Sequence, residues 1–377
     1  MKISSDLKYY GGGSDVVIFE RKSPFSTYVI CLSLNDTDKI RVLAPDNVIP
    51  HIRTAIMSFW PNGIQREQTL DKSFEFKLKG NPWGSFQNDG TESYFSASLM
   101  NGILSTLYHI GWIFVSAIDS GNREYDLNSL YFIYDPTETS KPENINSRFF
   151  ALTLNRTDRL RLLNIIPEIE ETVKSAMVHL WPYGIQKEKK VNGAYEFKLK
   201  GNPWFPQAEE AVTGRALISN LINFFSQHNW NLYGTIILTM SVSDKSAFFF
   251  RYCEKKPCKV QCLSLNETDK IRFIGDNTAA IERIRNSIIQ SWHKGIQNEK
   301  LYYGSWEFKM RGNPFSCYGS DSVYACYLMM TILNELESMG LKLIASADVS
   351  GKYVTDSNGS HSSHSVDLAT WYFDQII

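Results

Sequence analysis

The sequence contains the same set of short blocks three times, and this repetition constrains the fold more than any other feature. Residues 35–41, 155–161 and 266–272 share an Asn-x-Thr-Asp core, and a Trp-x-x-Gly-Ile-Gln block follows at residues 60–65, 181–186 and 292–297. A third block runs Glu-Phe-Lys-Leu-Lys-Gly-Asn-Pro-Trp, with small changes in the last copy, at residues 75–83, 196–204 and 307–315. Equivalent residues lie 120 or 121 and then 111 positions apart, which is the size of an independent domain and not of a short solenoid repeat. We therefore predict three tandem homologous domains.

Each copy shows two kinds of apolar spacing. The two-residue period of strands occurs at residues 28–34, 39–43, 75–79, 112–118 and 130–134 of the first copy. The four-residue spacing of helices occurs at Ile52 and Ile56, and at Leu99, Ile103 and Leu107. The order is thus β-β-α-β-α-β-β. Because only one face of the alternating strands is apolar, we predict an α+β fold in which two helices pack on a mixed sheet.

The domain boundaries follow from the composition between the copies. Residues 136–147 hold two prolines among Glu, Ser, Thr and Asn, which is typical of a linker, and residues 351–366 are Ser-rich and predict a loop. Residues 16–19 resemble the closing strand of a unit, so we expect an extra strand there that pairs with the first sheet. The predicted parts are an N-terminal extension at 1–22, repeat domain 1 at 23–135, the linker at 136–147, repeat domain 2 at 148–252 and repeat domain 3 at 253–377.

Composition limits the classes of function. Hydrophobic residues make up 43% of the 377 residues and charged residues 21%, which is typical of a folded protein. The net charge is −1, so the chain lacks the global positive field of nucleic-acid binders, and sequence-specific nucleic-acid binding is not expected. The first residues lack the apolar core of a signal peptide, and no apolar run approaches the roughly 20 residues that span a bilayer. We expect a cytoplasmic protein without a transmembrane segment.

A basic strand followed by an aromatic turn is the strongest candidate for a binding surface, because it recurs in every copy. Cations on one sheet face hold anionic groups, and an exposed aromatic ring stacks on a ligand or partner side chain. The candidate binding residues are Lys39, Arg41, Lys77, Lys79 and Trp83; Arg159, Arg161, Lys198, Lys200 and Trp204; and Lys270, Arg272, Lys309, Arg311 and Phe315.

A structural interpretation of the same residues stays open. The acids Glu75, Glu196 and Glu307 lie on the same strands and can neutralise the cations as cross-strand partners. In the turn, Gly permits a positive φ, Asn supports local hydrogen bonds, and the aromatic ring caps the core.

Catalysis is the main alternative to binding. Acids recur at Asp38, Asp158 and Asp269 and at Glu67, Glu188 and Glu299, and an enzyme could use the Glu set as acid and base at a domain junction. The histidines do not recur, and the sequence has no phosphate loop or nucleophile elbow. The cysteines at 253, 258 and 262 do not match zinc spacing, so no metal or cofactor is expected. Recognition of a phosphorylated lipid by the basic strands is a third alternative.

The Trp-x-x-Gly-Ile-Gln and Glu-Phe-Lys-Leu-Lys-Gly-Asn-Pro-Trp blocks together resemble those of a poorly characterised family of eukaryotic tandem-repeat proteins. The resemblance covers nearly the whole chain; the third copy departs from it at His293 and Phe315. It implies no activity and assigns no functional residues. We therefore predict a non-catalytic, multivalent binding or scaffold protein that recognises a protein or an anionic ligand; the sequence does not define the oligomeric state.

Overall fold

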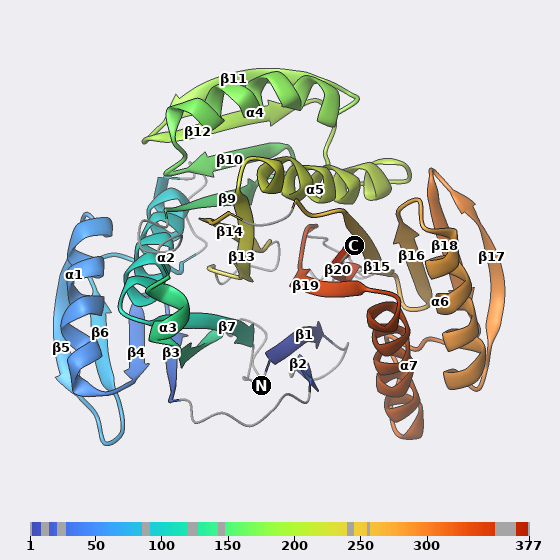
Figure 1. The fold of residues 1–377 in the computed structure, drawn as a ribbon, viewed down its shortest axis with the longest axis horizontal. Coiled ribbons are helices and arrows are strands. Elements are labelled where there is room, and N and C mark those ends of the chain that lie inside the picture. Colours follow the sequence, from blue (N-terminus) through green and yellow to red (C-terminus); the bar gives the residue numbers. More distant parts are fainter. Residues whose placement is uncertain are drawn as a thin grey trace, which may run out of the picture.

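The structure of the chain is a computed structural model that describes residues 2–8, 15–20, 28–84, 91–118, 127–141, 148–239, 245–254, 257–350 and 367–375. Within these residues the strands form three six-stranded sheets and one two-stranded sheet. The three units follow one another around a centre that their last strands surround (Figure 1).

The first unit defines the plan that the other two repeat. Its sheet has the order β5-β6-β4-β3-β8-β7, and every neighbouring pair is antiparallel. The elements are β3 (Val29–Asn35), β4 (Lys39–Leu43), the 3-10 turn η1 (Asp46–Val48), α1 (Ile49–Phe59), β5 (Ile64–Thr69), β6 (Phe74–Leu78), α2 (Thr91–His109), β7 (Trp112–Ile118) and β8 (Ser129–Tyr134).

The second and third units have the same element order. The second consists of β9 (Phe149–Asn155), β10 (Arg159–Leu163), α4 (Pro167–Leu180), β11 (Ile185–Val191), β12 (Ala194–Leu199), α5 (Glu210–Gln227), β13 (Trp230–Ile236) and β14 (Ala247–Tyr252). The third consists of β15 (Val260–Asn266), β16 (Lys270–Ile274), α6 (Thr278–Ser291), β17 (Ile296–Tyr302), β18 (Ser305–Met310), α7 (Ser320–Ser338), β19 (Leu341–Ala347) and β20 (Asp367–Gln375).

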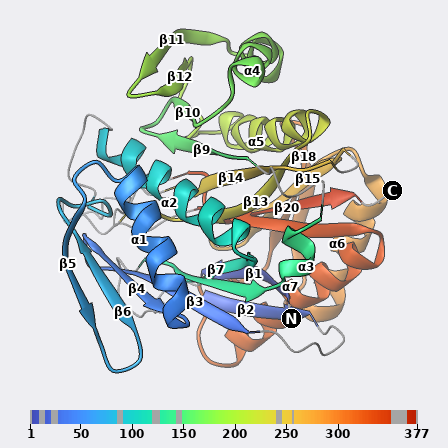
Figure 2. The ribbon, with the colours of Figure 1, turned by 60° about the vertical axis from the view of Figure 1, so that its left-hand side comes forward.

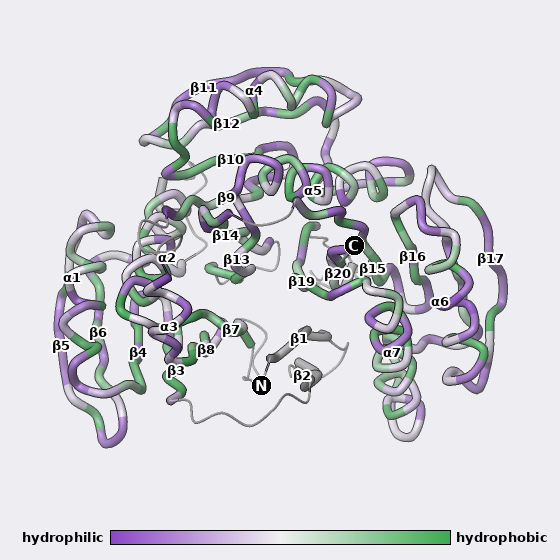
Figure 3. The backbone as a smooth tube through the Cα atoms, viewed as in Figure 1, coloured by the Kyte–Doolittle hydropathy of each residue, from purple (hydrophilic) through white to green (hydrophobic). Residues whose placement is uncertain are grey.

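The predicted α+β class and the three tandem domains are confirmed, and the strand order needs one correction. Each unit contains a sixth strand (β5, β11 or β17) after its first helix, and the sheets are antiparallel, not mixed. This strand begins in the Trp-x-x-Gly-Ile-Gln block and lies at the edge of its sheet, where its side chains are mostly exposed. Figure 3 shows β11 as a mainly hydrophilic segment. An exposed edge strand needs no apolar alternation, so the sequence pattern did not reveal it.

The repeated blocks hold two turns together. Thr37 Oγ1 donates to Asn81 Oδ1 at 2.9 Å, and the Trp83 backbone N–H donates to the Thr37 carbonyl at 2.9 Å. Asp36 and Gly80 have φ values of 50° and 82°, as their turns require. These contacts give the Asn-x-Thr and Gly-Asn-Pro-Trp blocks a structural role.

The predicted extension and linker take a more specific form. The extension forms β1 (Lys2–Lys8) and β2 (Asp15–Glu20), which pair with each other and not with the first sheet as expected. In the linker, Pro136–Thr139 forms the short helix α3, capped by the Asp135 side chain. Residues 142–147 and the predicted loop at 351–366 lie outside the described residues.

Trp204→Ala tests the structural role of the turn aromatic. The side chain is fully buried, and its Nε1–H donates to the Arg159 carbonyl at 2.8 Å. We expect the free energy of unfolding to fall by about 3–5 kcal/mol, measured by urea denaturation and far-ultraviolet circular dichroism. Val178→Ala in the same unit is the control, because that exposed side chain loses little packing and should change the value by less than about 0.5 kcal/mol. Equal losses for the two variants would contradict the role.

Candidate functional site

Most of the repeated cations are held in ion pairs. Arg41 Nε lies 2.9 Å from Glu75, and the equivalent Arg161 and Arg272 lie 2.6 and 2.7 Å from Glu196 and Glu307. The other paired cations are Lys39 with Asp36, Lys77 with Asp38, Arg159 and Lys198 with Glu196 and Asp158, Lys270 with Glu267, and Lys309 with Asp269. Lys79, Lys200 and Arg311 are exposed and have no ion pair within the described residues. The basic strands are therefore largely neutralised on the protein itself.

The aromatic residues of the turns do not reach the surface. Trp83 and Trp204 are fully buried, Phe315 is almost so, and the Trp83 indole N–H donates to the Lys39 carbonyl at 3.1 Å. The expectation that these rings are exposed for stacking is wrong. Their place in the core is the structural interpretation that the sequence left open.

The carboxylates of the enzyme alternative are also engaged. Arg53 Nε donates to Glu67 at 2.8 Å, and Glu188 accepts a hydrogen bond from the Tyr195 hydroxyl. Arg285 binds Glu299 through Nε at 2.9 Å, and this hydrogen bond lowers the pKa of the carboxyl. All three acids lie on the edge strands β5, β11 and β17. This geometry does not provide the free acid and base that catalysis needs.

The structure brings together a different set of residues, at the junctions between units. The second helix of each of the first two units packs on the next sheet: α2 contacts β9 and β10, and α5 contacts β15 and β16. The buried apolar cluster of the first unit continues into Ala151, Leu163 and Phe249 of the second. The cluster of the second unit likewise continues into Cys262, Ile274 and Tyr372 of the third. The cores of the first and second units thus include the facing surface of the following unit.

Polar contacts fix the first junction. Asn101 Nδ2 donates to the Phe149 carbonyl at 3.1 Å, and Arg251 Nη1 donates to the Tyr108 hydroxyl at 2.6 Å. The Arg251 guanidinium also lies 4.5 Å from the centre of the Tyr108 ring, in cation–π geometry. The Tyr233 hydroxyl accepts the Phe114 backbone N–H at 2.8 Å. These hydrogen bonds pair buried donors of one unit with acceptors of the other, although Asn101 Oδ1 is buried without a hydrogen-bond partner among the described residues.

The second junction uses the equivalent helix, α5, with other polar side chains. Asn223 Oδ1 accepts the Val260 backbone N–H at 2.6 Å, and Ser226 Oγ accepts that of Cys258 at 2.9 Å. The buried Arg215 donates to Thr370 Oγ1 at 3.1 Å and to Ser350 Oγ at 3.3 Å. The docking geometry is thus common to both junctions, whereas its polar contacts differ.

The sheet surface that receives a helix is buried in the second and third units and open in the first. We call it the outer sheet face, and its equivalent residues are Val29 and Leu43, Phe149 and Leu163, and Val260 and Ile274. Val29 is 61% exposed and Leu43 43%, whereas the four equivalent residues are at most 8% exposed. Both faces of β9 and β15 are buried, but β3 has one buried face. No helix covers the outer face of the first sheet among the described residues.

The helix surface that docks on the next sheet is open on α7. We call it the helix face, and it comprises Asn101 of α2, Ser219 of α5, and Tyr327 and Met330 of α7. Asn101 and Ser219 are 4% and 5% exposed, whereas Met330, at the equivalent position, is 42% exposed and Tyr327 50%. Within the described residues, the apolar cluster around α7 contains third-unit side chains alone. The outer sheet face of the first unit and the helix face of α7 together form what we call the open end.

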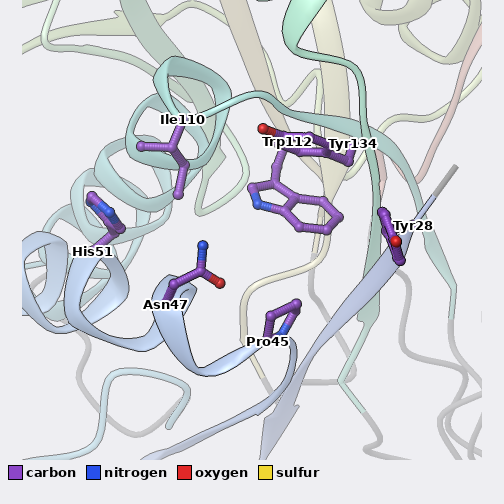
Figure 4. A pocket seen from close by; sticks show the side chains of 7 residues that line it. All are labelled: Tyr28, Pro45, Asn47, His51, Ile110, Trp112 and Tyr134. Atoms are coloured by element: carbon purple, nitrogen blue, oxygen red, sulfur yellow. The ribbon is translucent and has the colours of Figure 1, made fainter.

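A small cavity lies elsewhere in the first unit. Its volume is about 280 Å³, and its lining includes His51, Trp112 and Tyr134 (Figure 4). The equivalents of Trp112 and Tyr134 are Trp230 and Tyr252 in the second unit but Leu341 and Gln375 in the third. These two lining residues do not recur in the third unit, so the cavity is not a site common to the three units.

The fold and the junctions define a class of protein, a tandem array of one α+β domain. A family model for such a domain, whose description names no activity, matches residues 28–133, 148–251 and 259–374. These segments make up most of the chain, which therefore belongs to this family; the predicted membership in a repeat family is confirmed.

Two further comparisons add no activity. The chain is similar to a crystal structure described as a conserved kinetoplastid-specific protein from Trypanosoma cruzi, with 16% identity, a TM-score of 0.22, and coverage of 31% of this chain and 97% of that one. No curated protein matches the chain. In the described part of the chain, no helix combines the length and apolar character needed to cross a membrane.

Glu196→Gln tests how docking changes a repeated ion pair. Burial acts to raise the pKa of Glu196, but the Arg161 hydrogen bond and the nearby positive charges outweigh it, so the pKa lies below its ordinary value. Glutamine would remove the carboxylate charge beside the Arg161 side chain, which is 3% exposed. We expect unfolding free energy to fall by about 3–5 kcal/mol in urea denaturation.

Glu75→Gln is the matched control, because its partner Arg41 lies on the open outer sheet face and its side chain is 38% exposed. Water can solvate this arginine, so we expect less than half of the loss seen for Glu196→Gln. A Glu75→Gln loss as large as that of Glu196→Gln would contradict the effect of docking.

Proposed function

We propose that this chain is a non-catalytic scaffold protein that binds a protein partner at its open end. The observation that carries the proposal is the contrast between equivalent surfaces: the two internal junctions bury the outer sheet face and the helix face, and the open end exposes both. Surfaces equivalent to those of the open end already form two packed junctions, which supports a third junction at the open end.

The chemistry of the open end favours a protein over an anionic ligand. It presents Val29, Leu43, Tyr327 and Met330, and aromatic residues and methionine are enriched in protein interfaces. Val323 and Tyr324 extend the exposed apolar surface of α7. Most cations of the basic strands, in contrast, are already paired with acids, which reduces their attraction for a phosphate or an acidic partner.

Site-specific photocrosslinking tests the proposal. A crosslinkable residue at Tyr327 on α7 or at Leu43 on β4 should capture one and the same partner protein in cells, because β4 and α7 lie on the two sides of the β1–β2 hairpin (Figure 1). The same residue at Val178 should not capture it, since this exposed apolar side chain lies on α4 of the middle unit. Capture from all three positions, or from neither side of the open end, would contradict the proposal.

The purified partner should then bind the chain with an affinity that depends on the open end. We expect Tyr327→Glu with Met330→Glu to weaken binding at least tenfold in isothermal titration calorimetry, because charges enter an apolar interface. The control variant Lys79→Glu, Lys200→Glu, Arg311→Glu changes the exposed cations and should leave the affinity within about threefold at 0.15 M salt. The reverse order of the two effects would assign binding to the basic surface instead.

A further inference from the structure

The N-terminal hairpin contains a one-residue bulge like that of the closing hairpin of every unit. In β1 and β2, Lys2 and Ile3 pair with Glu20 and Phe19, one residue is skipped, and pairing resumes at Ser5 with Ile18. The closing hairpins also skip one residue, after Phe114, Leu232 and Leu343, with three pairs on each side of the skip, whereas β1–β2 has two pairs before it and four after it. A bulge sets the bend and twist of a hairpin, so its recurrence relates β1 and β2 to the closing hairpins.

The hairpin also lies where the closing hairpin of a fourth unit would lie. Strand β13 of the middle unit contacts β7 on one side and β19 on the other. Strand β1 contacts the same two strands, β7 and β19, from the opposite side of the centre (Figures 1 and 2). The four closing hairpins thus surround the centre, and the fourth lies between the last unit and the first.

Three surfaces next to this hairpin are those that the rest of a unit would cover. In the complete units the last strand pairs with the first, as β8 does with β3, whereas among the described strands β2 pairs with β1 alone. Among the described residues, no sheet packs on the helix face of α7 and no helix packs on the outer sheet face of the first unit. A strand edge, a helix face and a sheet face are therefore open around one position.

We propose that the partner at the open end is a polypeptide carrying the first six elements of this same unit, β-β-α-β-β-α, which completes the fourth unit on the hairpin β1–β2. Its first strand pairs antiparallel with β2, its sheet receives α7, and its second helix docks on β3 and β4. This inference rests on the proposed function and names the partner class. A second copy of this chain fits less well, because each of its units has its own closing hairpin, which would compete with β1–β2 for one place.

A fusion to the full chain tests the fit. Residues 148–229 of this chain contain β9 to α5 and serve as the probe. When the probe is joined directly to Met1, Lys2 takes the position that Asn231 has in the second unit, so the two hairpins are aligned on their bulges. Cys31 on the outer sheet face and Cys326 on α7 are partly exposed, whereas the equivalents Ala151, Cys262, Ala97 and Arg215 are buried. We expect both thiols to react with a maleimide at least tenfold more slowly in the fusion than in the parent, measured by peptide mass spectrometry.

The control thiol and the control variant stay within the same molecules. Cys258 is partly exposed at the second junction, away from the open end, and should react at the parent rate in the fusion. Tyr327→Glu with Met330→Glu should leave the parent Tm within about 2 °C, since both side chains are exposed there, and should restore Cys326 labelling in the fusion. A second fusion, with residues 28–111 as the probe, guards against misfolding of the first.

If Cys31 and Cys326 keep the parent labelling rate in both fusions, the completed fourth unit is excluded. This result leaves the proposed function standing when one partner is still captured from Tyr327 and Leu43. Protection in the fusion without any captured partner would support the fit of a fourth unit and would contradict the proposed scaffold function.

Discussion

The packing of one unit's second helix on the next unit's sheet organises this protein. Each sheet covers its inner face with its own helices, and the outer face of β9 or β15 stays dry because α2 or α5 lies on it. The hydrophobic contribution is substantial, since burying one side chain such as Phe149 contributes about 1.5–3 kcal/mol. The same docking buries Arg161, whose side chain is 3% exposed against 38% for the equivalent Arg41, whereas Glu75 and Glu196 are buried in both units. The junction thus determines which repeated residues carry energetic weight.

Much of the unit could be predicted from the sequence, because its determinants are local. The triplicated blocks fix three domains, and apolar spacing around Ile52 and Ile103 predicts helices that the structure contains. The exposed strand β5 was missed because edge strands need no apolar period. The basic surface was predicted to be free for binding because residue type alone does not distinguish a free cation from a paired one. The strand register determines the pairing, since Arg41 lies opposite Glu75 across β4 and β6.

The junctions could not be read from a single unit, although a signal for them exists. The first two outward positions of the first strand of each unit hold small or apolar residues, with Cys31, Ala151 and Cys262 at equivalent places. Such residues allow a helix to approach the strand closely, and a strand buried on both faces loses the alternation of a solvated sheet. The pattern does not say which helix covers the strand, because that helix lies in the preceding unit. Only the arrangement in space separates an end of the array from its interior.

The ends of a repeat array normally bear polar caps, because an uncovered junction surface exposes apolar area to water. Here the last helix presents Val323, Tyr324, Tyr327 and Met330 at the position where a cap would be polar. Tyrosine keeps its hydroxyl in water while its ring remains available for burial, which suits a surface that is alternately free and covered. The first sheet, in turn, leaves Val29 and Leu43 open, although the β1–β2 hairpin, with a bulge like that of the closing hairpins, contacts β7 of the same sheet. These exposed apolar side chains support our proposal that the open end is an unfinished junction.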